Sequence, residues 1–359
     1  MWKLCISSVL FLFLTWEPQP AALSAWGSQD LTKIAPKPEI TPETAQKLEE
    51  GLKTNPDNLA AREQLLKYYF QAMVKSRSIE LEKKRERHIL WLIEHAPDSQ
   101  LAGSPEAEIL PVGISGSTDA YEQGKQLWLA QVQDHPGDAR ILANAAQFLL
   151  LSDRNIARDL LQKALNLDPS NSLIATQLAQ TYDLERMMTS SSEEKAALAQ
   201  KALSIRERSL ENTGDEQRFD ELGDVAKVAF DADDLVKAGQ YASELLQDAP
   251  KYKKSWNYGN AIHTGNIILG RIALRRGDVP GADQYLLAAG ATPGSPQLDS
   301  FGPNMSLAKE LLEKGERDTV LAYLQSCTKF WQMGGTKLQG WIATVKAGGA
   351  PDFSSNLNY

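Results

Sequence analysis

Residues 138–169, DARILANAAQFLLLSDRNIARDLLQKALNLDP, read as two short helices followed by a proline that ends the second one. Small and apolar side chains recur in both halves at the three- and four-residue offsets of one helical face. Alanine in the second half lets two helices approach closely, and larger side chains fill the space beside them. The residues that carry this pattern are Ile141, Asn144, Ala145, Phe148, Ala157, Leu161 and Ala164.

This pattern resembles the tetratricopeptide repeat, whose unit of about 34 residues is a helix pair. Ile141 and Asn144 stand where that repeat usually has Trp and Leu. The resemblance extends over residues 41–330 and implies an all-α, right-handed superhelical solenoid of antiparallel helix pairs. Two weaker copies contain Leu222, Val225, Ala226, Ala229, Ala238, Ala242, Leu245 and Pro250, then Leu269, Gly270, Ala273, Gly277, Ala282, Leu286 and Ala289.

Prolines with turn-forming neighbours mark the ends of units at Pro56, Pro97, Pro136, Pro169 and Pro250. The first two intervals exceed one unit and the last spans two, so several units are expected to carry insertions. Residues 331–359 are predicted as a capping helix and tail that cover the last exposed apolar face. This end of the chain is similar to the ends of exported bacterial tetratricopeptide proteins, and that resemblance implies no activity.

The N-terminus has the pattern of a secretory signal peptide. Lys3 precedes an apolar run over residues 4–16, and the small residues Ser24 and Ala25 offer a cleavage point. We expect cleavage near Ala25, a flexible lead over residues 26–40, and export to the periplasm or the extracellular space. A retained anchor and a buried N-terminal helix are the alternatives, although the run is shorter than the about 20 residues of a membrane span.

Composition argues against a nucleic-acid partner and against an internal disulfide bond. The net charge of -8 argues against nucleic acid, because phosphate binding needs a basic face. Cleavage of the leader removes Cys5 and leaves Cys327 alone, so no internal disulfide is expected. Cys327 occupies the closing-alanine position of a degenerate unit, which predicts a buried, unreactive side chain.

The pattern also predicts helix boundaries and breaks. Thr41-Pro42-Glu43 predicts a capped helix start, and residues 59–95 are expected to form two helices joined at the charged run 82–87. Residues 99–118 form a long Gly-, Ser- and Pro-containing loop, which is either functional or packed on the repeat edge by its apolar centre. Further breaks are predicted at 187–194 and 290–304.

No motif indicates catalysis. The four histidines, His88, His95, His135 and His263, lack the spacing of a metal site. Two Ser-x-x-Lys matches, at 192–195 and 306–309, lack the companion motifs of the enzymes that use them. We therefore predict no catalytic residue, no cofactor and no metal.

Residues 251–276, KYKKSWNYGNAIHTGNIILGRIALRR, are the most unusual segment and are predicted to form one long helix. If this helix lines a groove, its polar stripe suits a carboxylate or another acidic group, because Arg offers a planar fork of donors. The competing interpretation is a polar face that satisfies neighbouring groups. The candidate groove residues are Asn257, Asn260, Thr264, Arg271 and Arg275 in the stripe, His263 beside it, and Lys227 one unit earlier.

These observations favour an exported, non-catalytic module that binds or scaffolds a protein or peptide. Two alternatives remain open at this stage: a secreted enzyme or enzyme subunit whose site uses the 99–118 loop and the 256–276 helix, and a structural spacer. The partner and the oligomeric state do not follow from the sequence.

Overall fold

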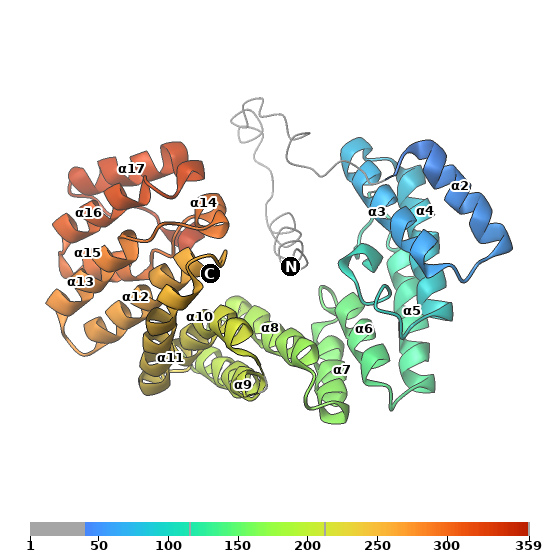
Figure 1. Cartoon of the computed structure of the whole chain (residues 1–359), viewed down its shortest axis with the longest axis horizontal. Coiled ribbons are helices and arrows are strands. Elements are labelled where there is room, and N and C mark those ends of the chain that lie inside the picture. Colours follow the sequence, from blue (N-terminus) through green and yellow to red (C-terminus); the bar gives the residue numbers. More distant parts are fainter. Residues whose placement is uncertain (1–39, 115, 212, 358–359) are drawn as a thin grey trace. The chain divides into compact units, whose positions relative to one another are not determined.

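The computed structural model describes residues 40–357 except 115 and 212 (Figure 1). The predicted signal peptide, residues 1–25, and the lead up to residue 39 lie outside the described residues. Within the described part the chain is all-α, 75% helical and without strands. Its α-helices are α2 Pro42–Thr54, α3 Leu59–Ser76, α4 Ile79–His95, α5 Asp119–Asp134, α6 Ala139–Leu149, α7 Arg154–Leu167, α8 Ser172–Met188, α9 Ser192–Leu210, α10 Asp215–Asp231, α11 Leu235–Asp248, α12 Tyr258–Arg275, α13 Val279–Gly290, α14 Pro296–Phe301, α15 Ser306–Lys314, α16 Arg317–Cys327 and α17 Gly335–Lys346.

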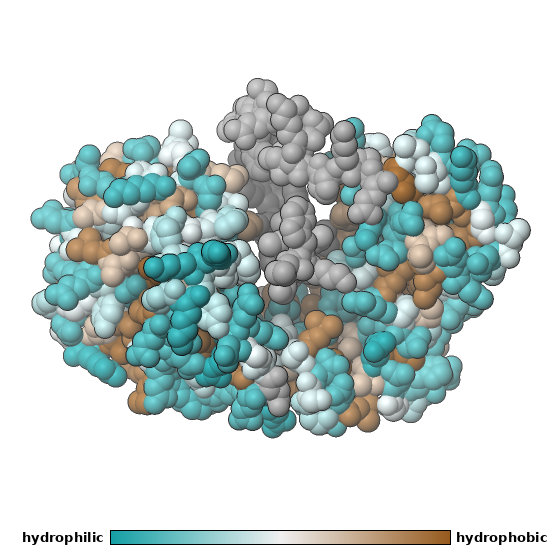
Figure 2. Space-filling model, viewed as in Figure 1, coloured by the Kyte–Doolittle hydropathy of each residue, from teal (hydrophilic) through white to brown (hydrophobic). Residues whose placement is uncertain are grey.

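The helices form two compact units that meet in the sequence between Pro169 and Ser170. Unit 1 contains α2–α7, and unit 2 contains α8–α17. In both units consecutive helices pack in pairs, with the densest contacts in α12–α13, α8–α9, α10–α11 and α6–α7 (Figure 1). No helix in the described part combines the length and the apolar character needed to span a bilayer. Figure 2 shows a mostly hydrophilic surface in which apolar residues form small patches.

The predicted small residues lie at the contacts within these pairs. Ala157 and Ala164 of α7 are fully buried, as are their counterparts in the weaker copies. Gly270 of α12 shows how closely α12 and α13 pack, because a Cβ atom there would lie 3.0 Å from Tyr285 Cβ of α13. The predicted packing of consecutive helices in pairs is therefore confirmed, with the predicted alanines buried.

Two predicted boundaries are wrong. The charged run 82–87 lies inside α4, and the chain turns earlier, where Arg77 adopts a left-handed backbone (φ 51°) and the Ser78 side chain caps α4. The long helix predicted from residue 251 begins only at Tyr258. Residues 249–252 form a 3₁₀ turn instead, and the ring of Tyr252 stacks on Phe219 with 4.6 Å between centroids. A tertiary contact outweighs helix propensity there.

The long loop 99–118 packs on unit 1 through polar side chains of the helices. Asn144 of α6 donates from Nδ2 to the carbonyl oxygens of Pro97 and Ser99, at 2.8 and 3.0 Å. Arg85 of α4 donates to the Glu106 carbonyl oxygen at 2.8 Å, next to the short 3₁₀ helix η2 Pro105–Ala107. Only part of the predicted apolar centre is covered: Ile109 is buried, whereas Leu110, Val112 and Ile114 are exposed.

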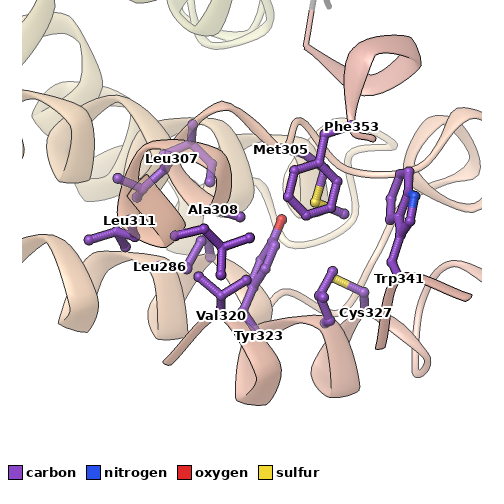
Figure 3. Packing of buried hydrophobic residues seen from close by; sticks show 14 of the residues in the cluster. Leu286, Met305, Leu307, Ala308, Leu311, Val320, Tyr323, Cys327, Trp341 and Phe353 are labelled. Atoms are coloured by element: carbon purple, nitrogen blue, oxygen red, sulfur yellow. The ribbon is translucent and has the colours of Figure 1, made fainter. Parts of the chain in front are cut away.

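Unit 2 ends in an apolar core that joins α13, α15, α16 and α17 (Figure 3). Cys327 lies in this core, so the prediction of a buried side chain is confirmed, and burial raises the pKa of its thiol. Trp341 packs edge-on against Phe353 with 4.9 Å between centroids. The backbone of the tail returns to the start of α15, where the Met305 N–H donates to the Asn356 carbonyl oxygen at 2.8 Å.

Candidate functional site

Helices α10 and α12 run side by side in the same direction. Three contacts fix their register: Asp220 with Asn257, Gly223 with Thr264, and Phe230 with Arg271. The predicted stripe on α12 therefore follows α10 along most of its length. The structure divides the stripe into two groups with different surroundings.

The first group lies at the start of α12 and is occupied by internal hydrogen bonds. Asn257 is buried and bonds to the Asp220 carboxylate. Asn260 accepts from the Ser295 hydroxyl at 2.6 Å and donates to Gln297 Oε1 at 2.9 Å. Asn260 thus holds the segment that follows α13, and Asn257 is bonded to α10, as the competing interpretation of the stripe predicts.

His263 also points inward. It is buried, and its Nε2 lies 2.9 Å from the hydroxyl oxygen of Tyr323 on α16. Burial lowers its pKa to about 3, so the ring is neutral near pH 7. His263 thus links two helices of unit 2 and does not face a ligand.

The second group gathers at the C-terminal end of α10. The Arg271 guanidinium stacks 4.2 Å from the Phe230 ring centre and donates from Nε and Nη2 to Glu310 Oε1, at 2.9 and 2.7 Å. Arg275 lies 5.2 Å from the same ring and pairs with Asp233 at 3.2 Å. The structure therefore brings the two predicted arginines together, but each already has an acidic partner.

Lys227, one turn before Phe230 on α10, borders an ion-pair network that sequence reasoning missed. Arg186 of α8 pairs with both Asp183 and Asp231, and Arg206 of α9 donates to Asp183 at 2.5 Å. The Nε atoms of both arginines are buried and find no hydrogen-bond partner among the described residues. The only sequence signal for this network is the three-residue spacing of Asp183 and Arg186.

Lys227 differs from these arginines because its charge is left without a direct partner. Its side chain is half-buried, and among the residues the structure describes its Nζ has neither a hydrogen bond nor an ion pair. Burial lowers the pKa of the amine, and nearby Arg186 adds to this, while Asp224 and Asp231 oppose it. An acidic group of a ligand would supply the missing partner.

The arginine and lysine side chains of this region are suited to binding an acidic group. In the described part of the chain no three His, Cys, Asp or Glu side chains are placed to hold a metal ion. No known family model matches the sequence, and no curated protein is detectably similar to it. The geometry of the region is thus the basis for a functional argument.

Proposed function

We propose that this chain is an exported, tetratricopeptide-like protein that binds a protein or peptide partner and has no catalytic activity of its own. The partner would dock on the Lys227 surface, which we define as Arg186, Lys227, Arg271 and Arg275; the ring of Phe230 is buried beneath the last two. Its helices α8, α10 and α12 are the first members of three consecutive pairs. The sequential packing of helix pairs supports the repeat resemblance, and the leader sequence supports export.

The half-buried, unpartnered ammonium of Lys227 carries the proposal. A cation that has lost part of its water without gaining a hydrogen bond raises the free energy of the unbound protein. A carboxylate of the partner would supply the opposite charge and accept hydrogen bonds from the Lys227 ammonium. Such a charged hydrogen bond is stronger than one between neutral groups. This moves the expected contact from Arg271, which is held by Glu310, to Lys227.

Replacement of Lys227 by Gln tests the proposal. The partner is first isolated by affinity capture from the envelope fraction of the producing cell and identified by mass spectrometry. We expect Lys227→Gln to weaken binding about tenfold, because a charged hydrogen bond is lost. Thermal stability should be unchanged or slightly higher, since the variant buries no unpaired charge.

Lys346→Gln is the matched control, because Lys346 is an exposed lysine of α17 in the same unit. Its affinity for the partner should equal that of the wild type. Unchanged affinity in Lys227→Gln, or an equal loss in the control, would exclude the Lys227 surface as the binding site.

A further inference from the structure

The exposed apolar side chains of unit 1 are concentrated in two segments. Five of the six large apolar side chains exposed in its described part lie in residues 74–79 and 110–114. Single exposed apolar residues are common, but a cluster of this kind marks interaction surfaces. The five residues are Val74 (60% exposed), Ile79 (44%), Leu110 (36%), Val112 (58%) and Ile114 (41%), and together they are called the turn surface.

Contacts between α4 and the loop bring these segments to the same end of the α3–α4 hairpin. The Ile114 N–H donates to Glu82 Oε1 at 2.7 Å, and Ile79 lies one turn before Glu82 on α4. Arg85, one turn after Glu82, binds the loop carbonyl of Glu106 and lies over the ring of Phe70 on α3. Val74 is one turn beyond Phe70 along α3, toward the same hairpin end.

Buried side chains and a backbone hydrogen bond hold the loop that presents this surface. Ile109 and Ala107 are buried, and the Gly113 N–H closes the following turn by donating to the Ser117 carbonyl oxygen at 3.0 Å. The apolar side chains are therefore already positioned in the unbound chain. A preformed surface loses less conformational entropy when a partner binds.

Positive charge borders the turn surface. Lys75, Arg77 and Lys83 are exposed, and within the described part of the chain none of them forms an ion pair. Lys84 is neutralised by Glu80 at 2.9 Å. Around these apolar side chains the exposed cations outnumber the exposed carboxylates, because Glu80 is paired with Lys84, Glu82 is buried and Glu86 is half-buried. In a chain of net charge -8, this exposed positive charge complements a ligand that is acidic and partly apolar.

We propose that the turn surface is a second docking site, which binds an acidic segment of another protein through its apolar side chains. It is separate from the Lys227 surface and does not depend on it. A protein segment fits better than an anionic membrane for two reasons. The unpaired cations number fewer than the about four to eight of membrane-binding basic clusters, and the turn surface contains none of the aromatic residues that anchor proteins at bilayer interfaces.

The test uses the full chain and two synthetic peptides of about 18 residues with the same Leu and Ile positions at helical spacing. One peptide has Glu at the intervening polar positions and the other has Lys. Fluorescence anisotropy measures the affinity of each. We expect the Glu peptide to bind at least about tenfold more tightly than the Lys peptide, with a difference that shrinks at high salt.

Two double variants divide the surface into its apolar and charged parts. Val112→Ser with Ile114→Ser, and Arg77→Asn with Lys83→Gln, should each weaken binding of the Glu peptide by about tenfold. Asn is chosen because it tolerates the left-handed backbone at residue 77. The controls are Val236→Ser with Met333→Ser, and Lys253→Gln with Lys254→Gln, which change exposed residues of unit 2 and should leave the affinity unchanged.

Circular dichroism confirms that each variant remains folded, and Lys227→Gln should bind the Glu peptide like the wild type. The proposal is overturned if both peptides bind equally, if neither surface variant loses affinity, or if Lys227→Gln abolishes binding. It is also overturned if the Glu peptide fails to bind while the Val112 and Ile114 variant loses adsorption to vesicles of phosphatidylcholine and phosphatidylserine. Loss of a dimer in that variant, without any binding of the Glu peptide, would instead identify a second copy as the occupant.

Discussion

His263 shows at the residue scale how a polar side chain with functional potential becomes part of the core. A helix stripe in the sequence places it beside Asn260 and Thr264, but in the structure it is buried and bonded to Tyr323. The residue that remains available for a ligand is Lys227, whose amine lacks a partner in the described part of the chain. The two residues differ in burial and in their partners: His263 is buried and bonded to Tyr323, whereas Lys227 is half-buried and has no partner among the described residues.

The depressed pKa of His263 predicts acid-sensitive stability. The folded-state pKa of about 3 lies below the unfolded value of 6.5, so the unfolded chain binds a proton first as the pH falls. The contribution of neutral His263 to the free energy of unfolding is therefore greatest above pH 6.5, and it decreases as the pH falls from 6.5 toward 3. At pH 4.5 the loss should be about 2 to 3 kcal/mol relative to pH 7.5.

His263→Gln should remove that part of the pH dependence, because an amide can still bond to Tyr323 but does not titrate. Urea unfolding of both proteins at pH 7.5 and 4.5 measures it. Burial also lowers the pKa of His88, so the free energy of unfolding of both proteins decreases with falling pH for this second reason. The contribution of His263 is therefore the difference between the wild type and the variant. An equal decrease in both proteins would contradict the assignment of a neutral, buried His263.

Gly259 is a second single-residue constraint, set by the backbone. A Cβ atom there would lie 1.8 Å from the Gly294 carbonyl oxygen, so Gly259→Ala should lower the free energy of unfolding by about 1 to 3 kcal/mol. Gly340 of α17 has no atom within 4 Å of its hypothetical Cβ. Gly340→Ala should therefore raise stability by about 0.5 to 1 kcal/mol, since alanine favours the helix. Denaturant unfolding of the two variants should give shifts of opposite sign.

At the scale of elements, the helix pair α6–α7 depends on small side chains at its contact. Ala157 and Ala164 are fully buried on α7, while Lys163 on the same helix is exposed. The amphipathic spacing turns the two alanines toward the neighbouring helix and the lysine toward water. The same arrangement recurs in α11 with Ala238 and Ala242.

Ala164→Leu should overpack this contact and lower stability by about 1 to 3 kcal/mol. Lys163→Leu introduces the same side chain one position earlier, on the exposed face, and should change stability by less than about 0.5 kcal/mol. Thermal unfolding followed by circular dichroism compares the two. Equal effects would show that the packing face of α7 is not the one described.

At the scale of the whole molecule, each unit has a core of its own. In unit 2 the core extends from α12 to the C-terminal tail, where Trp331, Trp341 and Phe353 cover the last helices. The capping role of residues 331–359 stays a prediction, which rests on the need of a helix-pair array for an end that shields its last apolar face. Within the described part the only cysteine is Cys327, which is free and buried.

Export is a prediction about the whole chain. The apolar run over residues 4–16 and the small residues before Trp26 predict cleavage near Ala25. N-terminal sequencing of the protein from its producing cell should find Trp26 as the first residue. A protein that keeps Met1 and fractionates with the cytosol would contradict both the cleavage and the proposed compartment.

Sequence periodicity alone was sufficient to predict the all-helical class, the packing of consecutive helices in pairs and the alanines at their contacts. The physical reason is that helix periodicity and the pairing of neighbouring helices are local, so the pattern of about 34 residues contains them. It was also sufficient to predict the buried Cys327. It misplaced the turn at Arg77 and the start of α12, where caps and a contact between Tyr252 and Phe219 decide the boundary.

Only the tertiary structure decided which polar residues are engaged. Arg271 meets Glu310, 39 residues away, and His263 meets Tyr323, 60 residues away. Periodicity states which face of a helix a side chain occupies, but not what the facing helix presents to it. For the same reason Lys227 could be predicted from the sequence, but its neighbours Arg186 and Asp231 could not. The sequence also did not show that Val112 and Ile114 of the loop 99–118 are exposed beside α4. Side-chain partners depend on distant segments, and their positions are set only when the whole chain has packed.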